Sequence, residues 1–224
     1  MLNYIKVKYG LDILLREDGY LLEKNVSERA VTHKLAEHLQ KIFPEWNVDC
    51  EYNRNINREK SISKENVRIL LVDMANYLQE SFPENRTVAD DEIYTKEEIN
   101  DLKKQLENPE KIQYIESLDL YLFLLEIDGE KFPQPVYPDI IIHHRGTKNN
   151  NIIIEAKKTG GKRKEMLYDL VKLAIFTSSK DYNYNDGIFI ELPVEEKFHR
   201  FSYFKKEKTY LNKVCKILPV IRRS

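Results

Sequence analysis

Residues 138–158 read PDIIIHHRGTKNNNIIIEAKK, and this stretch decides the fold class. Two isoleucine-rich runs flank the turn-forming segment RGTKNN at 145–150. Because β-branched residues favour strands and Gly and Asn favour turns, the stretch predicts a hairpin of two buried strands. Side chains alternate between the two faces of a strand, so Glu155 and Lys157 share one face with Ile153 while the intervening positions are apolar.

Downstream of this hairpin the pattern alternates between helix and strand. Gly160 and Gly161 break the chain, and the apolar majority of 166–176 predicts a helix. The run DGIFIEL at 186–192 predicts another short buried strand, introduced by a turn. A strand, helix and strand in this order are typical of an α/β protein.

Upstream, an amphipathic helix is expected over 25–43, where Val31, Leu35, Leu39 and Ile42 recur at helical spacing before Pro44. WNVDCEY at 46–52 then predicts a short strand, and the next residues, up to 61, read as a loop.

Residues 57–130 look like a helical insertion between the first and second core strands. Apolar residues at helical spacing predict helices over 65–82 and 112–127, and Thr95 with Glu98 has the spacing of a capping box that begins another. We therefore expect one α/β domain over 1–224, with a mixed central sheet flanked by helices and this insertion within it.

Bulk properties exclude several classes of protein. The 224 residues suffice for a sizeable core without cross-links, and the two cysteines, Cys50 and Cys215, have no metal or redox spacing. No apolar run is long enough to cross a bilayer and the start lacks signal-peptide character, so a cytoplasmic protein without membrane contact is expected. The net charge is −1, but 80–130 holds 15 acidic against 5 basic residues and 197–224 holds 9 basic against 1 acidic. Such asymmetry fits a phosphate-facing side, or simply solvated helix faces of different sign.

Polar residues at the two ends of the hairpin point to metal chemistry. A turn centred between Thr147 and Lys148 would put Asp139 opposite Ala156, and a shift of one residue would put it opposite Glu155 or Lys157. Two carboxylates suit Mg²⁺, whose remaining positions are filled by water and substrate phosphate. The lysine can orient water or stabilise charge on a phosphate, which makes phosphodiester hydrolysis the natural reaction. Considered one at a time, Asp139 would merely start a strand after Pro138, and Glu155 and Lys157 would form a solvent-exposed pair on an edge strand.

Pro138-Asp139 and Glu155-Ala156-Lys157 resemble the motif of the PD-(D/E)xK nuclease superfamily, which has the restriction-endonuclease-like fold. The resemblance covers mainly 25–52 and 135–195. It implies a mixed central sheet flanked by helices, Mg²⁺ or Mn²⁺ held by Asp139 and Glu155, and Lys157 as the catalytic lysine.

Members of this superfamily often add a glutamate from the first core helix, and Glu28 is the matching candidate for a catalytic and metal-binding role. Glu28 lies within the apolar stripe of its helix and should face the sheet. Alternatively, Asn25 and Glu28 have capping-box spacing, so Glu28 would only bond back to the helix start.

Basic residues after the hairpin are candidate contacts to nucleic acid: Lys158, Lys162, Arg163 and Lys164. Asp169 and Lys172 on the following helix read instead as an ordinary i,i+3 ion pair. His33 and His38 lack metal-pair spacing and are expected at the surface, and His143 lies several residues from the metal position.

The leading hypothesis is a metal-dependent nuclease acting on DNA rather than RNA, in phage defence, restriction or mobile-element maintenance by analogy. A homodimer would fit double-strand cleavage, but no residue identifies an interface. Two rivals remain: a non-catalytic nucleic-acid-binding or protein-interaction module on the same fold, and an acidic DNA mimic, against which the basic C-terminal stretch argues.

Overall fold

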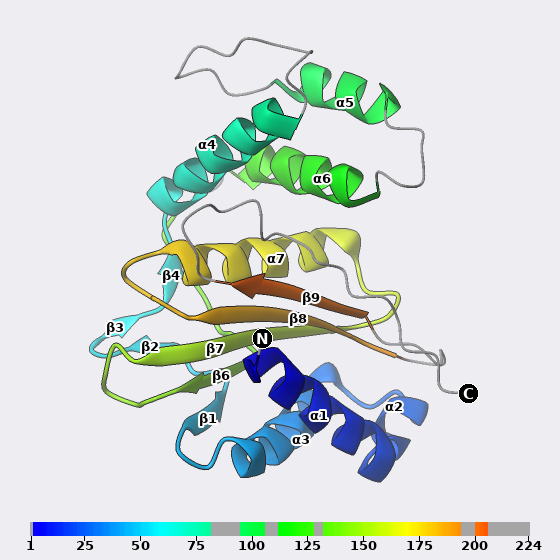
Figure 1. Cartoon of the computed structure of the whole chain (residues 1–224), viewed down its shortest axis with the longest axis vertical. Coiled ribbons are helices and arrows are strands. Elements are labelled where there is room, and N and C mark those ends of the chain that lie inside the picture. The colour runs from blue at the N-terminus through cyan, green and yellow to red at the C-terminus, as the bar shows by residue number, and fades with distance from the viewer. Residues whose placement is uncertain (1, 82–94, 106–111, 128–131, 194–199, 206–224) are drawn as a thin grey trace.

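A mixed five-stranded sheet forms the centre of the protein, in the order β1-β6-β7-β8-β9 (Figure 1). This computed structural model describes residues 2–81, 95–105, 112–127, 132–193 and 200–205. The strands of the sheet are β1 (Asn47–Cys50), β6 (Ile140–His143), β7 (Asn150–Lys158), β8 (Asp186–Leu192) and β9 (Arg200–Lys205).

The pairing of the strands combines a hairpin with a crossover. β6 runs antiparallel to both β1 and β7, whereas β7 runs parallel to β8. Between β7 and β8 the chain crosses over through α7 (Arg163–Ser178), as parallel strands require. β9 then pairs antiparallel with β8. The structure confirms the predicted hairpin, and the mixed sheet flanked by helices matches the expected α/β class.

Helices cover both faces of the sheet (Figure 1). On one face, α1 (Leu2–Glu17), α2 (Tyr20–Glu23) and α3 (Glu28–Ile42) bury their apolar sides. They pack on the side chains of Ile152, Ile154 and Ala156, together with Ile188 and Ile190. On the other face α7 covers Ile153, Ile141 and Phe189. The alternation predicted for β7 is therefore confirmed.

The segment between β1 and β6 in the chain is largely helical where it is described. It contains α4 (Lys64–Ser81), α5 (Lys96–Gln105) and α6 (Ile112–Ile127), whose described apolar side chains join the core on the α7 side. Two short strand pairs accompany these helices among the described residues: β2 (Arg54–Asn55) pairs with β3 (Arg58–Glu59), and β4 (Ser61–Ile62) pairs with β5 (Gln134–Pro135). The helices predicted over 65–82 and 112–127 are confirmed, as is the capping box, in which Glu98 N–H donates to Thr95 Oγ1 at 3.3 Å.

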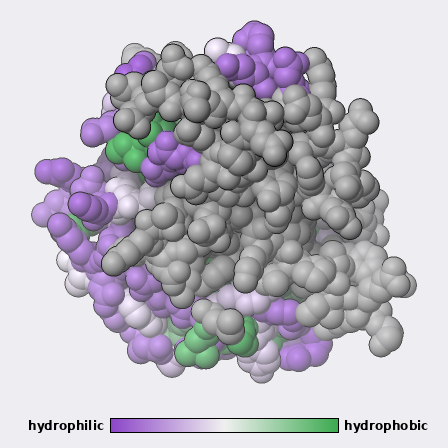
Figure 2. All heavy atoms as spheres, turned by 45° about the horizontal axis from the view of Figure 1, so that its top comes forward, coloured by the Kyte–Doolittle hydropathy of each residue, from purple (hydrophilic) through white to green (hydrophobic). Residues whose placement is uncertain are grey.

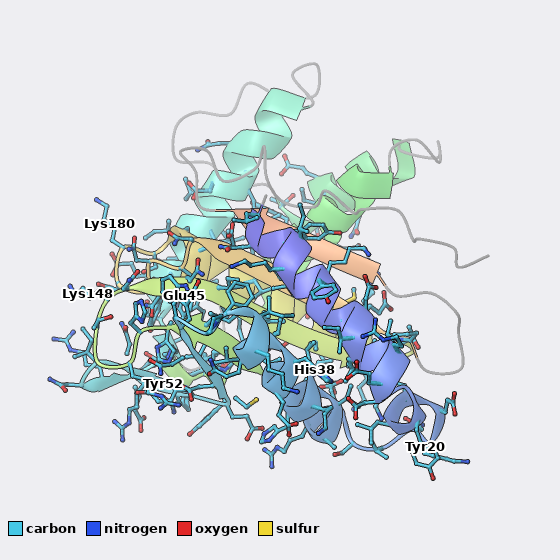
Figure 3. All side chains as sticks on the ribbon, turned by 60° about the horizontal axis from the view of Figure 1, so that its bottom comes forward. Tyr20, His38, Glu45, Tyr52, Lys148 and Lys180 are labelled. Atoms are coloured by element: carbon cyan, nitrogen blue, oxygen red, sulfur yellow. The ribbon has the colours of Figure 1, made fainter. Side chains whose placement is uncertain are left out.

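Some expectations were wrong in detail. The residues read as a loop after β1 form the β2–β3 hairpin, and α7 is longer than 166–176. α1, which was not predicted, crosses α3 closely: a Cβ at Gly10 would lie 2.7 Å from Leu39 Cδ2. His38 is buried rather than at the surface, with its Nε2 2.6 Å from Asp18 Oδ2 (Figure 3).

Among the described residues, no helix is long and apolar enough to cross a membrane. The coloured part of the surface in Figure 2 is mostly hydrophilic, with small hydrophobic clusters.

Candidate active site

The register of the β6–β7 hairpin places Asp139 in line with Glu155. Ile140 pairs with Ile154 and Ile141 with Ile153, and the register shifts by one residue at His143. The pairing of His143 with Asn150 centres the turn between Gly146 and Thr147, one residue before the expected centre. The register shift, typical of a β-bulge, then moves the alignment of the following pairs by one residue. Asp139 precedes Ile140, which pairs with Ile154. Extending this register by one residue places Asp139 opposite Glu155.

The Asp139 side chain is anchored to the neighbouring strand. Its Oδ2 accepts a hydrogen bond of 2.8 Å from the backbone N–H of Ala156. Burial nevertheless raises the pKa of Asp139 to about 6, because desolvation outweighs that bond, and the carboxylates of Asp169 and Glu28 add to the increase. Asp139 therefore lies in a region of concentrated negative charge.

Glu155 is almost completely inaccessible, with 1% of its surface exposed. Its Oε2 lies 2.8 Å from Lys172 Nζ, and its Oε1 has no hydrogen-bond partner among the described residues. Burial raises the pKa of Glu155 well above its usual value; Lys172 opposes this increase and Asp139 reinforces it. The influence of Asp139 on the pKa of Glu155 indicates that the Asp139 carboxylate lies near Glu155.

Lys157 lies between two further carboxylates. Its Nζ is 3.1 Å from Glu28 Oε1 and 3.5 Å from Asp169 Oδ2. Burial acts to lower the pKa of Lys157, but the attraction of Asp169 and Glu28 outweighs it and the pKa is raised. The lysine is therefore held in its charged form.

Glu28 reaches the site from the start of α3, across the end of β7. Its Oε2 accepts a 3.1 Å bond from the N–H of Lys158, in addition to the contact of its other oxygen with Lys157. The capping-box alternative for Glu28 is wrong, because the N-cap of α3 is Ser27, whose hydroxyl accepts from Ala30 N–H. Glu28 faces the sheet end as its position in the apolar stripe predicted.

The four basic candidates do not form one cluster with these residues. Lys158 Nζ donates a hydrogen bond of 2.7 Å to Asn25 Oδ1, which links the end of β7 to the segment before α3. Arg163 pairs with Asp119 of α6. The other two are exposed and form ion pairs along or beside α7: Lys162 with Glu165, and Lys164 with Glu126.

Sequence reasoning underestimated Asp169 and Lys172. They do form the expected i,i+3 pair, with Nζ 2.6 Å from Oδ1, but both are buried and both reach the site. Lys172 contacts Glu155, and Asp169 contacts Lys157. The available signal was a charged pair at 169 and 172 within the stretch 166–176, whose other residues are apolar or aromatic.

Charges at this site do not balance. Four carboxylates (Glu28, Asp139, Glu155 and Asp169) meet two ammonium groups (Lys157 and Lys172), which leaves two negative charges when all six are ionised. Within the described ranges, however, no three His, Cys, Asp or Glu side chains are arranged to hold a metal ion. Glu28, Asp139 and Glu155, the three metal ligands expected from the sequence, therefore do not form such a group in this structure.

Other predicted features lie elsewhere or beyond the described part of the chain. His143 is buried and its Nε2 lies 2.9 Å from Asp49 Oδ2. Much of the acidic stretch 80–130, most of the basic stretch 197–224, and Cys215 fall outside the described residues.

Comparisons with protein-family models, with curated proteins and with solved structures give no match for this chain.

Proposed function

We propose that this protein is a divalent-metal-dependent nuclease that hydrolyses phosphodiester bonds in DNA, built on the restriction-endonuclease-like fold that its PD-(D/E)xK motif implies. The observation that carries the proposal is the alignment of Asp139 with Glu155 across the hairpin, next to Lys157, together with a buried Glu155 oxygen that has no hydrogen-bond partner in the described part of the chain. A buried carboxylate oxygen without a partner is costly, and a cation would satisfy it.

The residues fit Mg²⁺ or Mn²⁺. Asp139 and Glu155 would hold the ion, since Mg²⁺ is commonly bound by one or two carboxylates while water and phosphate oxygens complete its shell. Its two positive charges equal the excess of negative charge at the site. A bound ion of this kind polarises the scissile phosphate and lowers the pKa of a coordinated water.

Lys157 contributes positive charge beside the reacting phosphate. Because Asp169 and Glu28 raise its pKa, it stays protonated at neutral pH. It therefore acts as a hydrogen-bond donor that stabilises charge developing on the phosphate, or that orients the attacking water, rather than as a general base. Glu28 and Asp169 hold its ammonium from two sides.

Contacts to the phosphate backbone are assigned to Lys162, Arg163 and Lys164 at the start of α7. The three side chains are at least half exposed, so phosphates can reach them. The ion pairs of Lys162 and Lys164 lie at the surface, where such pairs are weak, so these two lysines can exchange their acidic partners for a phosphate at modest cost.

A non-catalytic module on the same fold is the second candidate, and one observation favours it. Lys172 already neutralises Glu155, as a cation would, so the carboxylate is paired in the absence of metal. On this reading the buried charges would serve the fold alone.

Cleavage assays separate the two functions. Purified protein is incubated with plasmid DNA, single-stranded DNA and RNA in Mg²⁺, Mn²⁺ or EDTA, alongside Glu155→Gln and the control Glu165→Gln, which alters an exposed glutamate on α7. We expect metal-dependent cutting of DNA that Glu155→Gln abolishes and Glu165→Gln preserves. Binding of nucleic acid without cutting under every condition would support the non-catalytic module.

A further inference from the structure

Two buried charged residues of α7 contact the candidate site from the α7 side of the sheet. Asp169 and Lys172 are 4% and 8% exposed, and they lie one helical turn apart, facing the sheet. Lys172 Nζ lies 2.6 Å from Asp169 Oδ1 and 2.8 Å from Glu155 Oε2. The ammonium thus bridges a helix carboxylate and a strand carboxylate.

This bridge restricts the orientation of the Glu155 carboxylate. One oxygen is bound to Lys172, so the plane of the group and the direction of the other oxygen are determined by where α7 holds the ammonium. The other oxygen, Oε1, is the buried atom without a hydrogen-bond partner among the described residues. Ligating carboxylates are commonly hydrogen-bonded in this way by groups that do not touch the metal.

Asp169 joins both lysines of the site. Its Oδ1 binds Lys172. Its Oδ2, which is buried and has no hydrogen-bond partner among the residues that the structure describes, lies 3.5 Å from Lys157 Nζ. Movement of Asp169 would therefore disturb Glu155, through Lys172, and Lys157 directly.

We propose that Asp169 and Lys172 are positioning residues of the nuclease site. Lys172 orients Glu155 so that Oε1 is presented to the divalent cation, and Asp169 holds Lys172 and Lys157 in place. Neither residue touches metal or substrate. This inference rests on the proposed function, because it assigns the pair a role towards the cation that Glu155 and Asp139 would bind.

A purely structural role does not explain the charges. Replacing buried ion pairs with apolar residues of similar size is often neutral or stabilising, so a core position on α7 has no need of them. The two charges are explained if the Glu155 carboxylate has to remain buried and still be able to bind a cation.

The test measures metal binding in the absence of nucleic acid. Mn²⁺ is titrated calorimetrically into the metal-free protein and into Lys172→Met, Lys172→Arg and Asp169→Asn. We expect Lys172→Met and Asp169→Asn to weaken Mn²⁺ binding about 10- to 100-fold, the usual effect of removing a group that supports a ligand. Lys172→Arg, which keeps the charge and the donor, should recover most of the affinity.

A matched control changes another polar contact of a buried side chain, outside the residues of the site. Asp18→Asn removes the carboxylate that contacts buried His38 and should lower the melting temperature while leaving Mn²⁺ affinity unchanged. Equal Mn²⁺ affinity in wild-type protein, Lys172→Met and Asp169→Asn would overturn the positioning role and leave the nuclease proposal standing. If wild-type protein binds no Mn²⁺, the metal centre itself is wrong and this inference falls with it. Should Lys172→Met not fold, the isosteric Asp169→Asn decides.

Discussion

The carboxylates of Asp139 and Glu155 are largely shielded from water, and this burial raises the pKa of both groups. For Asp139 burial is the largest influence on the pKa, and the hydrogen bond from Ala156 only partly offsets it. Glu155 has a closer positive partner in Lys172 but is more deeply buried. Both groups therefore bind protons more readily than an exposed carboxylate does, unless a cation takes the proton's place.

The pKa of Asp139 predicts an unusual pH dependence of stability in metal-free protein. Its folded value of about 6 lies above its ordinary value of 3.8, so the folded state binds the proton more tightly. The resulting stabilisation is fully present below about pH 4 and is lost as pH rises through 6. Urea unfolding in EDTA between pH 4.5 and 7.5 should therefore show Asp139→Asn becoming more stable relative to wild type as pH rises. A constant difference across this range would contradict the raised pKa.

At the scale of elements, the hairpin aligns two residues of the site, and the connection from α7 to β8 packs against α7 and β4. The irregularity at His143 aligns Asp139 with Glu155. After α7, the chain packs Tyr182 and Tyr184 against Phe176, with ring centroids 4.2 Å and 6.1 Å from it. The two tyrosines differ in one respect: Tyr182 Oη donates to Ser61 O and accepts from Ser61 N–H, whereas the buried Tyr184 Oη has no hydrogen-bond partner within the described part of the chain.

This difference predicts opposite effects of the same substitution. A buried polar group without a partner costs about 1–3 kcal/mol, so Tyr184→Phe should raise the free energy of unfolding by about 1–2 kcal/mol. Tyr182→Phe removes two hydrogen bonds to β4 and should lower it by about 1–2 kcal/mol. Denaturant unfolding of both variants checks the pair, and destabilisation by Tyr184→Phe would show that its hydroxyl has a partner.

For the whole molecule, the site lies where both helical layers meet the end of β7. Glu28 arrives with α3 from one face of the sheet, and Asp169 and Lys172 arrive with α7 from the other. The excess of negative charge therefore belongs to several elements at once. Neutralising this negative charge should therefore stabilise the packing of α3 and α7 on the sheet, rather than one helix alone.

Binding of a divalent cation should consequently stabilise the entire fold. At a metal concentration of about 100 times the dissociation constant, the free energy of unfolding should increase by about 2.7 kcal/mol. Thermal unfolding in EDTA, Mg²⁺ and Mn²⁺ would show this as a rise in melting temperature that disappears in Glu155→Gln. An equal rise in Glu155→Gln would mean that the cation binds somewhere else.

Local patterns were sufficient for much of the architecture. The alternation in β7, the stripe of α3 and the capping box at Thr95 each depend on neighbours in the chain, and all are confirmed. α1 was overlooked although Val7, Leu11 and Leu14 have helical spacing. Gly10 interrupts that pattern for a tertiary reason, since a Cβ at this position would lie 2.7 Å from Leu39 Cδ2 and would force the Leu39 side chain to shift.

The sequence by itself determined the hairpin, the face shared by Glu155 and Lys157, and the candidate residues at its ends. Only the tertiary structure decided which groups surround them. Spacing along α7 identified Asp169 and Lys172 as an ion pair, but the contact of Lys172 with Glu155 depends on how α7 packs across the sheet. Periodicity specifies which side of an element is buried, because it reflects backbone geometry within that element. It does not specify which element lies opposite, because that follows from the packing of the whole core.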